Sequence, residues 1–270
     1  PKNLLSPKDI YTPSLNLITM TKNYTTLLLK KSLFLYILRT VPLFIFAYLT
    51  YTYKTFLFFP LMIIIPFAFV YFLPQIYKPF NKFKPYHGKY RTKIFDLAKE
   101  HDVKIKEIVS SKTGFSGAAL GLWNNQVIFI NSRILKQPWE EIKSLYLHEF
   151  AHFKNKDLEF MAVYPAITFM IFSYFSYISR GDFLYIFYML LLFSVIFHVR
   201  YLRILRLKEK SADNYTIKDN PKAWISLIKK GIKHLESKGI YFQKKKPLLS
   251  FLHTHPWIYD RIDYAKKYRK

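Results

Sequence analysis

The chain has 270 residues, of which 51% are hydrophobic and 19% aromatic, and it carries a formal net charge of +25. This composition is compatible with one large soluble domain or with a helical membrane protein that has a smaller soluble part. Cysteine is absent, which excludes disulfide bonds and thiolate ligands, so any metal site must use histidine and carboxylate side chains.

Two long apolar blocks favour the membrane protein. Between residues 33 and 77 the only charged residues are Arg39 and Lys54, and between 160 and 199 they are Arg180 and Asp182. Each block is long enough for two crossings, because one crossing takes about 20 apolar residues. The first block is too long for a signal-peptide core and leads directly into a second span, so we expect no cleavable signal. Four transmembrane helices are predicted, at 33–53, 56–77, 160–179 and 183–199.

The basic residues gather outside these blocks. The chain divides into a basic tail (1–31), a first helical pair (32–77), a central region (78–159), a second helical pair (160–202) and a C-terminal region (203–270). Lys and Arg crowd the tail and the segments that follow the second and fourth spans, so the positive-inside rule places these three regions in the cytoplasm. A basic surface facing anionic lipid explains the charge better than a nucleic-acid partner does. The bias toward Lys, Phe, Tyr and Ile suggests an AT-rich bacterial genome, and hence the inner membrane.

The central region predicts a helix and a small β-hairpin-like element, the strand part of the small sheet. Residues 90–102 have an apolar face at helical spacing, and 103–111 alternate as a strand does. Residues 126–131 are a β-branched and aromatic run, and the stretch before them is rich in small residues and ends in a turn signal.

A metal-binding motif follows this sheet. The segment 137–157 predicts a helix with Pro138 near its start, and "HEFAH" lies within it. At a spacing of four residues, His148 and His152 project from one face and can reach the same ion. Glu149 is turned aside toward a water molecule. Zinc bound to such an H-E-x-x-H motif lowers the pKa of its water, and the glutamate takes the proton as the water attacks a carbonyl group.

The third ligand is not fixed by the motif. Leu158 stands where a downstream histidine of the metzincin pattern would be required. A glutamate on a second helix is the other common solution, and Glu209 follows the fourth span, on the same side of the membrane as the two histidines. The alternative is that Glu209 is a solvated charge on a Lys-rich helix.

Three stretches together resemble the M48 family of integral-membrane zinc metalloproteases, in particular its HtpX-like members. They are "HEFAHFKNKD" at 148–157, "RLKEKSAD" at 206–213 and "THPWIYDRI" at 254–262. The resemblance covers roughly residues 30–265. It implies a mainly α integral-membrane protein with four transmembrane helices and a cytoplasmic zincin-like (gluzincin) catalytic domain that contains a small β-sheet.

The resemblance also implies roles for individual residues. One zinc ion per chain would be bound by His148, His152 and Glu209, with Glu149 as the catalytic base. Further groups would be Asp157 and Asp213 as residues that orient ligands or brace helices, His255 as the oxyanion-stabilising group and Arg261 as a neighbouring brace. For His255 and Arg261 the alternative is a C-terminal turn and a surface charge.

One position departs from the family pattern. Where members usually carry an Asn-Ala pair whose Asn contacts the substrate backbone, this chain has Ser116 or Gly117. The strand at 126–131 is expected to be an exposed edge that takes substrate by strand addition.

The expected function is that of a membrane-bound zinc endopeptidase that cleaves membrane or misfolded proteins, as in HtpX-like quality control under stress. Two alternatives stay open. A CAAX-type prenyl-protein protease would need more spans than this chain supplies. A membrane scaffold with a structural zinc site would have no use for Glu149.

Overall fold

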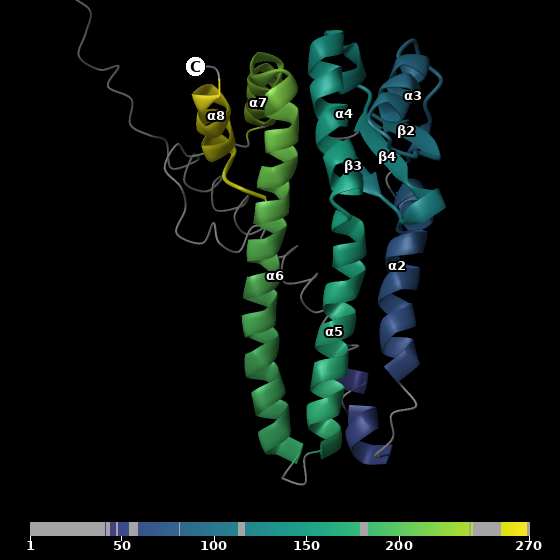
Figure 1. Ribbon diagram of the computed structural model, residues 1–270, viewed down its shortest axis with the longest axis vertical. Helices are drawn as coiled ribbons and strands as arrows, with labels where there is room; N and C mark the ends of the chain where they lie inside the picture. Colours follow the sequence, from purple (N-terminus) through teal and green to yellow (C-terminus); the bar gives the residue numbers. More distant parts are fainter. Residues whose placement is uncertain are drawn as a thin grey trace, which may run out of the picture.

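The long helices α2 (Phe59–Phe80), α5 (Asp157–Ile178) and α6 (Phe183–Asp219) stand side by side and carry a small sheet and shorter helices at one end (Figure 1). The computed structural model describes residues 41, 44–46, 48–53, 59–80, 82–112, 117–178, 183–237, 239 and 255–268.

The helices α2, α5 and α6 are each long and apolar enough to cross a membrane. They match the second, third and fourth predicted spans, although α6 continues far beyond the predicted end at 199. The first predicted span lies mostly outside the described residues, and only its last part, 48–53, is seen as continuous helix. The count of four and the cytoplasmic orientation stay predictions.

The spanning helices share a small apolar core. Met62 of α2, Phe169 and Phe172 of α5 and Leu190 of α6 are buried against one another. Many of the other apolar side chains on these helices are exposed, including Ile64 with 57% of its surface. Such outward apolar faces are typical of helices surrounded by lipid.

The sheet has four strands in the order β1-β2-β4-β3. They are β1 (Lys84–Pro85), β2 (Glu107–Ser111), β3 (Gly117–Leu120) and β4 (Val127–Asn131). β2 and β4 are parallel, whereas β1 pairs with β2 and β3 pairs with β4 in antiparallel fashion. The expected hairpin of 103–111 with 126–131 is therefore wrong, because the small-residue stretch between them contains a third strand, β3, which takes the antiparallel place beside β4.

The expectation that 126–131 forms an exposed edge is wrong. β4 lies between β2 and β3, and all five of its residues are buried. The physical reason is visible in the sequence "VIFIN", which lacks the polar alternation of a half-exposed strand and is typical of a strand covered on both faces. The strands on the two edges are β1 and β3, and β3 is the edge strand beside β4.

Shorter helices complete the domain: α3 (Arg91–Glu100), η2 (Trp123–Asn125), η3 (Ile134–Lys136), α4 (Trp139–Lys154), α7 (Pro221–Glu236) and α8 (Ile258–Lys267). α4 is its central helix and contacts β3, α5, α6 and α7. Tyr146, Leu147 and Phe150 on α4 are almost fully buried in the main core. This packing holds α4 rigidly.

α4 leads directly into the second helical pair. The helix ends at Lys154, and Lys156 has a positive φ of 53°, which breaks the helix before α5 begins at Asp157. In Figure 1, α4 stands above α5 in the same stack. The C-terminal half of α4, which carries the H-E-x-x-H motif, therefore lies next to the end of a membrane-spanning helix.

Candidate metal centre

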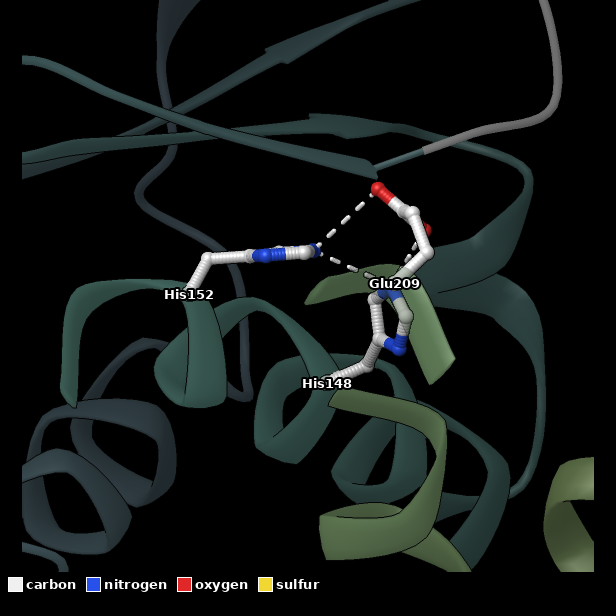
Figure 2. Close-up of side chains that lie close together, drawn as sticks. All are labelled: His148, His152 and Glu209. Atoms are coloured by element: carbon white, nitrogen blue, oxygen red, sulfur yellow. Dashed lines mark hydrogen bonds and ion pairs between the residues drawn. The ribbon is translucent and has the colours of Figure 1, made fainter. Parts of the chain in front are cut away.

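His148, His152 and Glu209 converge at the junction of α4 and α6. Figure 2 shows the two imidazole rings, one helical turn apart, facing the Glu209 carboxylate. The two Nε2 atoms are 3.3 Å apart, His148 Nε2 is 3.5 Å from Glu209 Oε2, and His152 Nε2 is 3.5 Å from Glu209 Oε1. The glutamate expected from a second helix thus lies beside the two histidines.

This triangle of donor atoms fits a metal ion. Ligand atoms about 2.0 to 2.1 Å from a tetrahedral zinc ion are separated from one another by roughly 3.3 to 3.4 Å. The observed separations of 3.3 and 3.5 Å are close to that spacing. Two imidazoles and one carboxylate are also a ligand set that catalytic zinc sites use, and they leave a fourth position open.

The far side of each imidazole ring faces a carboxylate. His152 Nδ1 is 2.8 Å from Asp157 Oδ2, and His148 Nδ1 is 3.2 Å from Asp213 Oδ1. When each Nδ1–H points to its carboxylate, each neutral ring presents a lone pair at Nε2. Two lone pairs and a carboxylate then face one another, an arrangement that a bound cation stabilises.

The surroundings of His148 are strongly acidic. Burial by itself would lower the pKa of this imidazole, but interactions with the Asp213 and Glu209 carboxylates raise its pKa to about 9. The negative charge that holds a proton so firmly also attracts a metal cation.

Glu149 is buried next to the histidines, and only 5% of its surface is exposed. Burial raises the pKa of its carboxyl group, while the positive charges of His148 and His152 oppose the rise. The first residue of β3 lies against the Glu149 side chain: a Cβ added at Gly117 would be 2.9 Å from Glu149 Oε1. A buried carboxyl group with a raised pKa, beside an edge strand, is suited to accept and return a proton.

The C-terminal segment brings two further predicted residues to the site. His255 Nδ1 is 2.9 Å from Glu209 Oε2, and 62% of the His255 side chain is exposed. Arg261 on α8 donates two hydrogen bonds to Asp213, of 2.8 and 2.6 Å. Arg261 therefore holds the carboxylate that faces His148. The roles inferred for these residues stay predictions.

The last two candidates lie near the start of β3. Gly117 is its first residue, and Ser116 lies outside the described residues.

Trp224 is part of the site although the sequence did not single it out. Its ring stacks on the His148 imidazole, with centroids 5.0 Å apart and planes at 22°. The Arg261 guanidinium lies 5.3 Å from the centroid of the same indole. Trp224 is on α7, whose amphipathic pattern predicts a buried tryptophan but not its neighbour.

Replacing Asp157 by asparagine is expected to weaken zinc binding by about 10- to 100-fold. Asp157 Oδ2 orients His152, and its Oδ1 accepts from Lys208 Nζ at 2.6 Å. An amide keeps the shape but loses the charge that favours the Nδ1–H tautomer. Competition with a zinc-selective chelator measures the affinity. Asp263→Asn on the exposed face of α8 is the matched control, and equal affinities for the two variants would contradict the orienting role.

Comparisons with known proteins identify the family of the chain. The family model for peptidase family M48 matches residues 88–269. The fold is similar to that in the crystal structure of S. mikatae Ste24p, with a TM-score of 0.63 and 19% sequence identity over 92% of this chain and 67% of that chain. No curated protein matches the sequence. Because the family model covers more than half of its length, the chain belongs to peptidase family M48.

Proposed function

We propose that this membrane metalloprotease is a zinc endopeptidase that hydrolyses peptide bonds of membrane or misfolded proteins, with its site facing the cytoplasm at the inner membrane. The observation that carries the proposal is the convergence of His148, His152 and Glu209 within ligand distance of one ion. Glu149 lies beside them on the same helix, and family M48 metalloproteases are zinc-dependent.

The residues of the site would divide the chemistry among them. Zinc bound by the triad would make a water molecule acidic enough to lose a proton near neutral pH. Glu149 takes that proton as the water attacks the peptide carbonyl, and then passes it to the leaving amine. His255, largely exposed beside Glu209, would donate a hydrogen bond to the carbonyl oxygen as that oxygen becomes negative.

The β3 edge is the surface proposed to hold the substrate. Within the described part of the chain, β3 pairs with β4 along one side only, and it packs against α4, which carries the H-E-x-x-H motif. An extended peptide added alongside β3 would run past Glu149, and backbone hydrogen bonds would hold it without regard to side-chain identity. Such recognition suits an enzyme that acts on many unfolded sequences.

Replacing Gly117 by alanine is expected to lower kcat by about tenfold or more. The new Cβ would lie 2.9 Å from Glu149 Oε1 and 3.1 Å from Leu145 Cδ2, so either the base or the strand must move. Zinc content and thermal stability should stay near those of the parent. Steady-state hydrolysis of a fluorogenic peptide measures the change, and parental kcat would show that the strand does not constrain Glu149.

A CAAX-type protease is the second candidate, because the fold resembles that of Ste24p, a CAAX protease. The decisive experiment gives the detergent-purified protein two substrates: casein, and a farnesylated peptide that ends in a CAAX sequence. We expect chelator-sensitive cleavage of casein and no preference for the farnesylated peptide over its unmodified form. Cleavage of the farnesylated peptide alone would favour the second candidate, and zinc-loaded protein that cleaves neither would favour a structural zinc site.

A further inference from the structure

An exposed tryptophan sits beside a membrane-spanning helix. The residues 121–125, here called the Trp123 loop, leave β3 and lead through η2 toward β4. Leu122 is fully buried, whereas 58% of the Trp123 surface is exposed. The Trp123 ring lies 6.2 Å, between centroids, from both Phe67 and Tyr71 of α2.

The loop is held firmly against α2. Gly121, at a φ of +96°, packs so closely that an added Cβ would lie 2.9 Å from Pro74 Cγ. Asn125, 1% exposed, donates from Nδ2 to the carbonyl oxygen of Tyr71 at 2.6 Å and exchanges two hydrogen bonds with the Gln75 amide. Trp123 itself is held at a φ of 50°, an uncommon conformation for a bulky residue. The position of the indole is therefore fixed by the fold.

The loop lies at the depth of the apolar part of α2. Lys78, at the basic end of α2, forms a close ion pair with Glu107 of β2. Tyr71 and Phe67 come about two and about three helical turns earlier, or roughly 10 and 16 Å below Lys78 along the helix axis. Lys106 Nζ donates to Asn125 Oδ1 of the loop at 3.0 Å, so a charged amine lies beside the loop and marks a headgroup level close to it. The indole, beside Tyr71 and Phe67, lies on the apolar side of that level.

An apolar hollow of about 350 Å³ adjoins the indole, lined by Ile63, Ile64, Phe67, Ala68, Tyr71 and Trp123. The hollow is shallow and largely open, so it is a depression in the outward surface of α2 and not an enclosed cavity. It is continuous with the outward face of α2, where Ile64 is 57% exposed. Phe44, Phe46 and Tyr51, which precede α2 in the chain, pack against the small apolar core around Met62.

We propose that the Trp123 loop is a membrane contact: the Trp123 indole lies among phospholipid acyl chains just below the headgroups, and one acyl chain occupies the adjoining hollow. This contact requires only that α2 crosses a bilayer, and it does not depend on the proposed proteolysis. Because the loop directly follows β3, this contact would hold the edge of β3, where the substrate is proposed to bind, close to the bilayer surface. That coupling fits substrates that emerge from the membrane.

The absence of cysteine allows single spin labels to be placed at chosen depths. Trp123→Cys is labelled with a nitroxide in vesicles of phosphatidylcholine and phosphatidylglycerol. Ile64→Cys serves as the lipid control, and Asp263→Cys, with 67% of its side chain exposed on α8, as the water control. Collisions with oxygen and with a water-soluble nickel chelate then report depth.

We expect the label at position 123 to behave like that at position 64, with high oxygen and low nickel accessibility. Nickel accessibility like that at position 263 would overturn the proposal, and so would a label shielded from both quenchers, which would indicate a protein cover.

A second measurement uses the unlabelled protein. Brominated phospholipids should quench less of the tryptophan fluorescence in Trp123→Phe than in the parent, whereas Trp139→Phe, at the start of α4, should not reduce that quenching. Equal quenching in the parent and in Trp123→Phe would also contradict the contact.

Discussion

Replacing Glu149 by glutamine is expected to abolish peptide hydrolysis while zinc stays bound. The amide has the same shape and would still fit beneath β3, but it accepts no proton from the attacking water. General acid–base catalysis contributes about 10²- to 10⁴-fold to such rates, and kcat should fall within that range or beyond it. Casein cleavage and zinc content are measured on the same purified sample.

The matched control for this substitution lies on the same helix. Glu140 is exposed in the first turn of α4, and Glu140→Gln should retain parental activity. If Glu149→Gln cleaves casein at the parental rate, the base is another group and the proposed mechanism is wrong. If the variant also loses zinc, Glu149 has a structural role that its position beside the ligands does not suggest.

The second large effect is expected at the third ligand. Replacing Glu209 by alanine removes one of the three protein donor atoms, and we expect zinc affinity to fall more than about 100-fold, beyond the losses typical of groups that only orient a ligand. The purified variant should then contain little zinc, and its activity should be lost with the metal. Metal analysis and chelator competition measure both quantities.

Glu100→Ala is the matched control, because Glu100 is an exposed carboxylate on α3, away from the site. It should bind zinc as the parent does. Parental zinc affinity in Glu209→Ala would mean that another carboxylate completes the site. Asp213, 3.2 Å from His148 Nδ1, would then be the first alternative to test by substitution.

Features set by residues close together in the sequence could be predicted, whereas features set by contacts between distant segments could not be predicted from local patterns alone. His148, Glu149 and His152 belong to one helix, and helical periodicity alone places them on adjoining faces. Glu209 is different, because it comes near them only through the packing of α6 on α4. Its place could be expected from the end of a span and from the family resemblance, but no local rule required it.

The features that sequence reasoning missed or misplaced have different causes. The strand at 126–131 was expected at the edge, although its unbroken apolar run already indicated a strand covered on both faces. Trp224 stacks on His148 from a helix whose pattern predicts burial and nothing more. The extension of α6 well beyond residue 199 could not be read from hydropathy, since only its first half is apolar while the rest is basic and carries Glu209.

The central claim is that two imidazoles and one carboxylate of this chain bind a catalytic zinc ion. X-ray absorption at the zinc edge of the detergent-purified protein tests it most directly. We predict about one zinc per chain, with two imidazole nitrogens and oxygen ligands at roughly 2.0 to 2.2 Å. A protein that binds no zinc even after reconstitution, or a zinc spectrum without the two-imidazole signature, would contradict the account.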